Sequence, residues 1–266
     1  MLERLCGAGP GLPGPRTLLV VAHPDDEILG AGSRLAHLPG LGVVFLTDGA
    51  PRDLADARAA GFERRERYAV ARRREAAAAL RAAGAAHARQ MHLGAVDQEA
   101  VFALSRLAGE LARIVERERP ELLLTHAYEG GHPDHDAAAF VARAAVRAAE
   151  AGGARAALAE FPLYNQPGEG PVRHDFLPGG DPGRTLRLDA AQRATKLQAL
   201  ACHATQERVW RGMPVDEERF RLAPAHDFTR APHAGRLHYE RFAWGVSAAL
   251  WCELARKALA ELEPCC

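Results

Sequence analysis

The chain has 266 residues, of which 48% are hydrophobic and 26% are charged, and this composition is typical of a globular protein, not a disordered or fibrous one. Lysine plus arginine and aspartate plus glutamate number 34 each, so the formal net charge is zero. No overall field therefore attracts the chain to nucleic acid or to an anionic membrane surface, and we expect no nucleic-acid partner.

The cysteines and the apolar stretches bear on the compartment. Five cysteines form no C-x-x-C pair, and an odd number suits a reducing compartment better than a disulfide framework. The first 16 residues lack the uninterrupted apolar core of a signal peptide, and no stretch reaches the roughly 18 apolar residues that span a bilayer. We expect a cytoplasmic protein without a membrane span, and the sequence leaves open whether it forms a homo-oligomer.

Strand-like and helix-like patterns alternate along most of the chain. An irregular Gly- and Pro-rich arm is expected over 1–15, and strands are expected over 17–22, 43–49, 89–94 and 121–126. Helices are expected over 28–37, 99–118 and 189–205. Three further helices are expected, of which one ends near Gly84, one begins at His135 and one begins near Gly245. Segment 165–185 interrupts the alternation with glycines and prolines and is too long for a simple turn, so we interpret it as a candidate lid.

This order of elements predicts the fold class. Strand, helix and strand in succession form right-handed βαβ units, which place parallel strands in one sheet with helices on both faces. We therefore predict an α/β fold, a Rossmann-like three-layer sandwich with a mainly parallel sheet. A single domain over residues 1–266 is expected, in which the role of 207–266 is not assigned.

Two of the predicted strands end in unusually dense clusters of acidic and histidine residues. The strand over 17–22 is followed by HPDDE, with His23, Asp25 and Asp26, and the strand over 121–126 leads into HAYEGGHPDH, with His126, Glu129, His132, Asp134 and His135. In open α/β sheets the ligand crevice lies at the carboxyl ends of the strands. Both clusters should therefore meet there.

The spacing within the clusters predicts a metal site. His23 and Asp26 are three residues apart, as are His132 and His135, so each pair can face one way within a helical turn. Two imidazoles and one carboxylate leave positions open for water and substrate, as catalytic zinc requires. We predict zinc held by His23, Asp26 and His135.

The remaining residues of the clusters suggest roles around that metal. Asp25 lies beside a predicted ligand and is the natural general base for a water molecule. His132, as an imidazolium, would stabilise an oxyanion or protonate the leaving amine. Asp134 would orient that imidazole through a hydrogen bond.

The motifs AHPDDE and HPDH, in this order and on these strands, resemble those of the LmbE-like, or PIG-L, N-acetylglucosaminyl deacetylases. The resemblance implies zinc held at positions matching His23, Asp26 and His135, a general base matching Asp25, and transition-state stabilisation or proton donation by the residue matching His132. Weaker matches at 47–49, 72–75 and 196–206 extend the resemblance over roughly residues 17–206. The resemblance also implies substrate hydroxyl contacts at Arg72 and Asp97. Some members have a tyrosine where this chain has Gly130, with Tyr128 the nearest aromatic ring.

Structural roles compete with functional ones at several of these positions. Carboxylates favour the start of a helix, so HPDDE by itself also describes a solvated helix start. Arg72 could be an exposed helix arginine paired with Glu75 or Glu66, and Asp97 could cap the following helix. His203 and Gln206 are interpreted as residues that satisfy buried backbone near a helix end.

The sequence therefore favours a zinc-dependent hydrolase that removes an N-acetyl group from a small-molecule amino-sugar conjugate. Two alternatives remain open at this point. Two histidines and a carboxylate also describe the iron site of non-haem oxygenases, although such an enzyme has no evident use for the carboxylate of Asp25. The second alternative is a non-catalytic sugar- or nucleotide-binding protein of the same fold, although every catalytic residue type is present.

Overall fold

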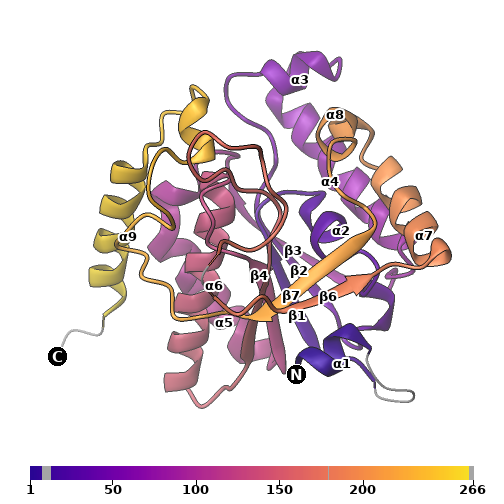
Figure 1. Cartoon of the computed structure of the whole chain (residues 1–266), viewed down its shortest axis with the longest axis horizontal. Coiled ribbons are helices and arrows are strands. Elements are labelled where there is room, and N and C mark those ends of the chain that lie inside the picture. Colours follow the sequence, from indigo (N-terminus) through magenta and orange to yellow (C-terminus); the bar gives the residue numbers. More distant parts are fainter. Residues whose placement is uncertain (8–12, 179, 264–266) are drawn as a thin grey trace.

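A computed structural model describes residues 1–7, 13–178 and 180–263, and its centre is one mixed sheet (Figure 1). The strand order is β3-β2-β1-β4-β5-β7-β6, in which the first five strands are parallel and the last two pair antiparallel. The strands are β1 (Thr17–Val21), β2 (Gly42–Thr47), β3 (Arg89–Ala95), β4 (Leu122–His126), β5 (Ala157–Phe161), β6 (Arg184–Arg187) and β7 (Glu217–Leu222). The predicted fold class is confirmed.

Helices cover both faces of the sheet (Figure 1). The α-helices are α1 (Leu2–Cys6), α2 (Asp26–Ala31), α3 (Ala55–Ala59), α4 (Arg65–Ala82), α5 (Leu104–Glu118), α6 (Pro133–Ala151), α7 (Ala190–Ala201), α8 (Glu207–Trp210) and α9 (Ala248–Leu262), and short 3₁₀ turns η1 (Leu35–His37), η2 (Ala100–Ala103), η3 (Ala204–Gln206) and η4 (His238–Arg241) join them.

Alternation along the central strands builds two separate cores. Leu18 and Val20 of β1 pack on the face covered by α5, α6 and α9, while Leu19 and Val21 pack on the face covered by α1, α2, α4 and α7. Successive side chains of a strand point to opposite faces, so a strand buried on both faces has to be apolar throughout. This is why β1 is a continuous apolar run in the sequence.

The structure differs from the expected elements at both ends of the chain. The arm over 1–15 is not irregular throughout, because Leu2–Cys6 form α1 and Leu5 is fully buried; residues 8–12 lie outside the described residues. The antiparallel strands β6 and β7 were not predicted from the sequence. They are short and largely charged, so they lack the apolar run that marks β1.

The expected helix over 28–37 is divided in two by a buried ion pair. Lys196 of α7 donates from Nζ to the Leu29 carbonyl at 2.8 Å and to Glu218 of β7 at 2.9 Å, while Glu218 accepts the Ser33 N–H at 2.9 Å. The Leu29 carbonyl and the Ser33 N–H are the two groups that a continued α-helix would join. The ion pair therefore takes up both, and α2 ends at Ala31.

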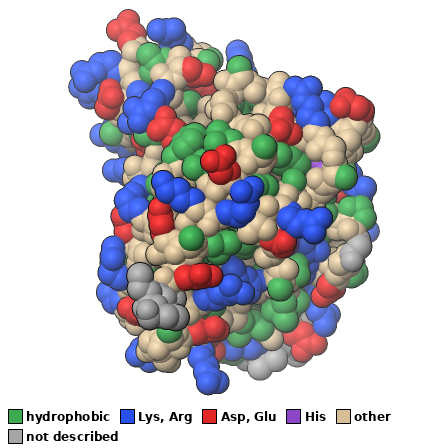
Figure 2. Space-filling view, turned by 90° about the vertical axis from the view of Figure 1, so that its left-hand side faces the viewer, with side chains coloured by type: hydrophobic (Ala, Val, Ile, Leu, Met, Phe, Trp, Pro, Cys, Tyr) green, Lys and Arg blue, Asp and Glu red, His purple; other side chains and the backbone are tan. Residues whose placement is uncertain are grey.

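Charges of both signs are interspersed on the surface that includes α9, with apolar atoms between them (Figure 2). This pattern agrees with the zero net charge and offers no single-sign field for a polyanion. Among the described residues, we find no helix with the length and apolar character that crossing a membrane requires.

The Lys196–Glu218 pair generates a stability prediction. Lys196→Met removes a fully buried cation, leaving the Glu218 carboxylate uncompensated, so the free energy of unfolding should fall by about 3–5 kcal/mol. The control is Lys257→Met, which removes the other lysine of the chain, an exposed one, and should change the value by less than about 0.5 kcal/mol. Urea denaturation measures both, and equal losses would contradict the assigned role of the ion pair.

Candidate metal centre and active site

The two motif clusters meet because their strands are neighbours. β1 and β4 pair in parallel, with Leu18 opposite Leu123, so the loops that leave their carboxyl ends lie side by side. His23 follows β1 and Asp26 begins α2, while His126 ends β4 and His135 lies in the first turn of α6. The strand order reverses at this point, since β2 lies on one side of β1 and β4 on the other.

The Asp26 carboxylate lies among three imidazoles. Its Oδ2 is 3.3 Å from Nδ1 of His23 and 3.3 Å from Nε2 of His126, and its Oδ1 is 3.5 Å from Nε2 of His135. Burial by itself would raise the pKa of Asp26, but the neighbouring His135 and His126 outweigh it and hold the pKa well below its usual range. The carboxylate is therefore ionised and available as a ligand.

The opposite edge of the His23 ring faces two further carboxylates. Nε2 of His23 lies 3.0 Å from Oδ1 of Asp97 and 3.2 Å from Oδ2 of Asp134. Potential ligand atoms come within 4.8 Å of one another in three overlapping groups, which are His23, His132 and His135; His23, Asp97, His132 and Asp134; and Asp26, His126 and His135.

The predicted ligands His23, Asp26 and His135 are thus close neighbours that belong to two overlapping groups. His23 and His135 share one group with His132, whereas Asp26 and His135 share another with His126. His126 is the member of this cluster to which the sequence assigned no role. Its position at the last residue of β4, directly opposite the HPDDE loop, is the signal that points to it.

The residues present fit a divalent cation. Among the described residues, four carboxylates lie at the cluster, and the cations that face them are the guanidinium of Arg72 and the imidazole of His23, whose pKa lies well above its usual value because the effect of burial is outweighed by Asp97. The carboxylates therefore attract positive charge to this site. Nδ1 of His126 and Nδ1 of His135 are buried without a hydrogen-bond partner in the described structure. Imidazole and carboxylate are ligands that zinc accepts. The four carboxylates are those of Asp25, Asp26, Asp97 and Asp134.

Asp25 adopts a strained backbone that aims its carboxylate at the same site. Its φ of 129° is in a region that residues other than glycine rarely occupy, and such strain persists only when the surroundings enforce it. Here the Asp25 N–H donates to Oε2 of Glu27 at 2.9 Å, and Oδ2 accepts from Arg72 at 3.1 Å. Burial raises the pKa of Asp25 to about 7, although Arg72 opposes the shift.

Arg72 is a buried anchor of α4 and not an exposed surface residue. Its guanidinium donates to the Gly49 carbonyl at 2.7 Å and to the Pro24 carbonyl at 2.6 Å, in addition to Asp25. The alternative of an exposed Arg72 paired with Glu75 or Glu66 is wrong. The Glu75 carboxylate accepts hydrogen bonds from Thr205, and Glu66 lies near Arg64 and Arg65. Arg72 therefore joins the ends of β1 and β2 around the candidate base.

His132 is oriented by a backbone amide. The Asp134 N–H donates to Nδ1 of His132 at 3.1 Å, so a neutral imidazole carries its proton on Nε2. Burial lowers the pKa of His132 to about 3, with His23 adding to the effect. The structure therefore favours a neutral Nε2–H donor at this position, whereas the sequence suggested an imidazolium held by the Asp134 carboxylate.

Asp134, and not Asp97, has a carboxylate that binds backbone N–H groups at the start of the helical turn that follows Asp97. Asp134 accepts the N–H groups of Gln98 at 2.6 Å and Ala100 at 3.0 Å, and so binds the segment after β3 to α6. Asp97 was a candidate helix cap, but its carboxylate faces His23 and lies 3.8 Å from Arg72. Asp97 therefore belongs to the site, and Asp134 is fully buried beneath it.

A cavity of about 140 Å³ opens above these groups. Its lining combines polar side chains, which include the candidate base and ligands, with apolar ones. The polar lining is His23, Asp25, Asp26, Asp56, Arg72, Asp97, Gln98, His132, His135 and Gln206, and the remaining lining is Leu29, Tyr164, Val209, Met213 and Trp244.

The tyrosine that lines this cavity is Tyr164 and not Tyr128. Tyr128 packs against Trp251 and donates from its hydroxyl to the Arg230 carbonyl, away from the site. Tyr164 follows β5, and its ring centre lies 5.2 Å from that of His135. A side chain at Gly130 would meet Leu237 at 2.9 Å, so the C-terminal segment already fills that space.

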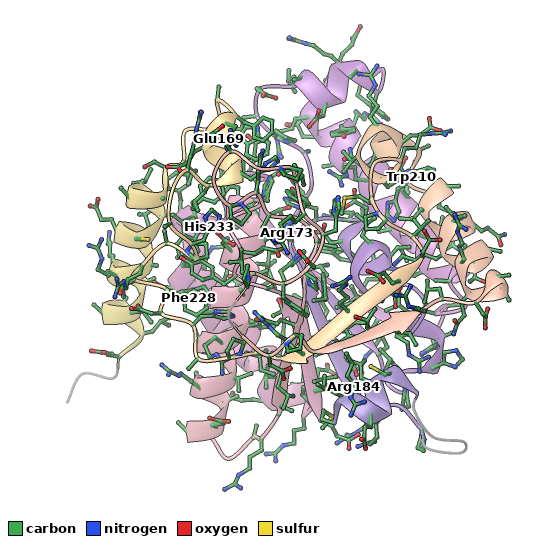
Figure 3. All side chains as sticks on the ribbon, viewed as in Figure 1. Glu169, Arg173, Arg184, Trp210, Phe228 and His233 are labelled. Carbon is green, nitrogen blue, oxygen red and sulfur yellow. The ribbon has the colours of Figure 1, made fainter. Side chains whose placement is uncertain are left out.

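Segment 165–185 contributes none of the residues that line the cavity, as far as the structure describes it. Glu169 of this segment pairs with Arg241, and Gln166 accepts from His238, so it packs against the turn η4. Figure 3 shows Glu169 and Arg173 on these loops, apart from Trp210 at the end of α8. The predicted lid is therefore a support for the C-terminal segment in this structure.

His203 and Gln206 only partly match their expected structural role. Gln206 donates to the Thr205 carbonyl at 3.1 Å and to the Tyr68 hydroxyl, and it also lines the cavity. The His203 ring lies 3.3 Å from Glu27, the residue that holds the Asp25 N–H, and neither ring nitrogen has a hydrogen bond in the described structure. Both residues thus belong to the surroundings of the site.

Comparison with known proteins agrees with the fold and the cluster. The family profile described as PIG-L, GlcNAc-PI de-N-acetylase, matches residues 18–146. The 1D-myo-inositol 2-acetamido-2-deoxy-alpha-D-glucopyranoside deacetylase of Actinosynnema mirum is 32% identical over 240 residues, which cover 74% of this chain and 82% of that protein. The chain belongs to the PIG-L, or LmbE-like, family.

Two solved structures illustrate what shares this fold. The A40926 pseudoaglycone deacetylase Dbv21 superimposes with a TM-score of 0.60 at 21% identity, covering 80% of this chain and 99% of that one. The 4-carboxy-2-hydroxymuconate hydratase GalB of Pseudomonas putida has a TM-score of 0.53 at 24% identity, covering 74% and 82%. Since a hydratase shares the fold, the reaction has to be argued from the site.

The Arg72 contacts predict a stability difference between neighbouring arginines of α4. Arg72→Lys replaces a planar fork by a single ammonium that cannot reach both carbonyls and Asp25 together, so the free energy of unfolding should fall by about 1–3 kcal/mol. Arg73→Lys alters an exposed residue and should cost less than about 0.5 kcal/mol. Urea denaturation compares the two, and an unchanged midpoint in Arg72→Lys would show that these contacts add no stability.

Proposed function

We propose that the protein is a zinc-dependent N-deacetylase that hydrolyses the acetamide of an amino-sugar conjugate. The observation that carries the proposal is the convergence, on one cavity, of a histidine and carboxylate cluster, a carboxylate base and an imidazole N–H donor. These are the groups that amide hydrolysis requires. Membership of a deacetylase family supports the same reaction.

His23, Asp26 and His135 would hold the zinc, with His126 and His132 as neighbours that complete the cluster. When bound, zinc would supply a Lewis acid that lowers the pKa of a water molecule and polarises a carbonyl oxygen. The backbone N–H of His23 donates to Oδ2 of Asp26 at 2.7 Å and would orient this carboxylate, as the hydrogen-bond partners of a ligating carboxylate do.

Asp25 would accept the proton of the attacking water. Arg72 fixes one oxygen of its carboxylate, and the strained backbone leaves the group directed at the cavity. As the water oxygen bonds to the acetamide carbon, its proton passes to Asp25. The C–N bond then breaks, and Asp25 returns this proton to the leaving nitrogen, so the products are acetate and a free amine.

His132 is placed to stabilise the carbonyl oxygen as it becomes negative. The Asp134 amide holds Nδ1, so Nε2–H is the group that remains for the substrate. A fixed donor of this kind costs no reorganisation during the reaction and is typically worth about 10²- to 10³-fold in rate. Arg72 and Asp97 line the same cavity and are our candidates for contacts with sugar hydroxyls.

The oxygenase and the non-catalytic alternatives are less well supported. An oxygenase would leave the Asp25 carboxylate, its anchor Arg72 and its strained backbone without a use. A binding protein would have no need for this strain either. Iron content with oxygen consumption would favour the first alternative, and sugar binding without acetate release would favour the second.

The metal assignment predicts different outcomes for neighbouring residues. The purified protein should contain about one zinc per chain, and Asp26→Ala or His135→Ala should weaken zinc affinity by more than the roughly 10- to 100-fold that outer-shell changes cost. Asp25→Asn and the exposed His37→Ala should retain zinc. Elemental analysis after dialysis measures this, and full occupancy in the two ligand variants would overturn the assigned ligands.

The reaction itself is tested by following acetate and free amine. We expect acetate from glycosides of N-acetylglucosamine, with slower turnover of the free sugar because remote binding energy is missing. Asp25→Asn should lower kcat by about 10²- to 10⁴-fold with little change in KM, since a base acts in the transition state. Faster hydrolysis of an N-acetyl amino acid than of every sugar would reject the amino-sugar substrate and keep the amidase.

A further inference from the structure

Two aromatic residues at and beside the cavity, Trp244 and Phe242, have no part in the proposed chemistry. Trp244 lines the cavity, and its ring centre lies 4.7 Å from that of His132. The Trp244 ring also stacks on Phe242, with centres 4.5 Å apart and planes inclined by 17°. The row His132, Trp244 and Phe242 therefore leads from the active site to the surface, where Phe242 is 45% exposed.

Further apolar side chains line the same cavity. Leu29 of α2, Val209 of α8 and Met213 contribute to its wall, and Val209 is 49% exposed. Exposed apolar side chains that continue a binding cavity are typical of ligand grooves, because a soluble protein otherwise gains nothing from placing them together. The cavity thus has polar groups that suit an acetamide and hydroxyls, and it also has an apolar side, the apolar exit, that leads to the surface.

The aromatic row is held rigidly by the C-terminal segment. Phe242 contacts the ring of His238 at 5.2 Å between centres, and the His238 N–H donates to the Gly130 carbonyl at 2.9 Å, in the loop that carries His132. The Glu240 carboxylate accepts the N–H groups of Leu237 at 2.8 Å and Ala248 at 2.9 Å. These contacts position the row without any ligand, so it is prepared for a planar partner.

We infer that the amino-sugar substrate carries a planar apolar aglycone, which leaves the active site along Trp244 and packs against Phe242. This inference rests on the proposed function and specifies its substrate. A planar group gains stacking energy on an aromatic face, whereas a flexible chain gains only contact area. Trp244 and Phe242 lie outside residues 18–146, so they are not part of the segment that the family profile matches.

The test compares phenyl and methyl glycosides of N-acetylglucosamine. The phenyl glycoside should have the higher kcat/KM, by about three- to tenfold, which is the range expected for one aromatic contact. Phe242→Ala should remove most of this preference, measured as the ratio of kcat/KM for the phenyl glycoside to kcat/KM for the methyl glycoside. Phe102→Ala, which removes an exposed phenylalanine beside α9, is the matched control and should keep the preference.

A binding measurement separates recognition from chemistry. The phenyl and methyl glycosides of glucosamine have no amide to hydrolyse, and calorimetry should show tighter binding of the phenyl compound to the wild type but not to Phe242→Ala. Equal binding and equal kcat/KM of the two glycosides in the wild type would overturn the inference. So would a methyl glycoside of N-octanoylglucosamine that reacts faster than the phenyl N-acetyl compound, because the apolar exit would then serve the acyl group.

The outcomes for this inference and for the proposed function are distinct. Acetate release from both glycosides at equal rates leaves the deacetylase in place and rejects only the aglycone. Absence of acetate from every N-acetylglucosamine compound rejects the proposed function, whatever the binding data show.

Discussion

The parallel pairing of β1 with β4 is the constraint on which the site depends. It brings two loops rich in carboxylates and imidazoles to one edge of the sheet, and the pairing of the two strands keeps these loops close together. Like charges at these distances are unfavourable in a buried site unless cations compensate for them. Arg72 compensates for one carboxylate, and the remaining carboxylates, together with the ring nitrogens of His126 and His135 that have no partner in the described structure, support a metal at this site.

Around that cluster the fold assigns each acidic residue a different environment. Asp26 is surrounded by imidazoles, which keep it ionised, while burial raises the pKa of Asp25 and Arg72 holds it in place. Asp134 binds backbone N–H groups beneath the site. Three carboxylates within a few ångströms can therefore serve as ligand, base and scaffold, because their hydrogen-bond partners differ.

The second half of the chain supports the site. The Lys196–Glu218 pair ends α2 after a turn and a half and joins it to α7 and β7, and the turn η4 holds the aromatic row beside His132. These parts pack around the catalytic loops without supplying a candidate ligand or the base.

The sequence by itself determined the α/β fold class and the residues of both clusters, because strand periodicity and residue types are local properties. It also indicated the crevice, since the carboxyl ends of parallel strands share one edge. Only the tertiary structure decided that Arg72 is buried against Asp25, that the Asp134 backbone orients His132, and that Tyr164 and Trp244 line the cavity. Each of these contacts joins residues from separate elements or depends on the direction of a hydrogen bond. Contacts between distant residues and hydrogen-bond directions leave no periodic signal in the sequence.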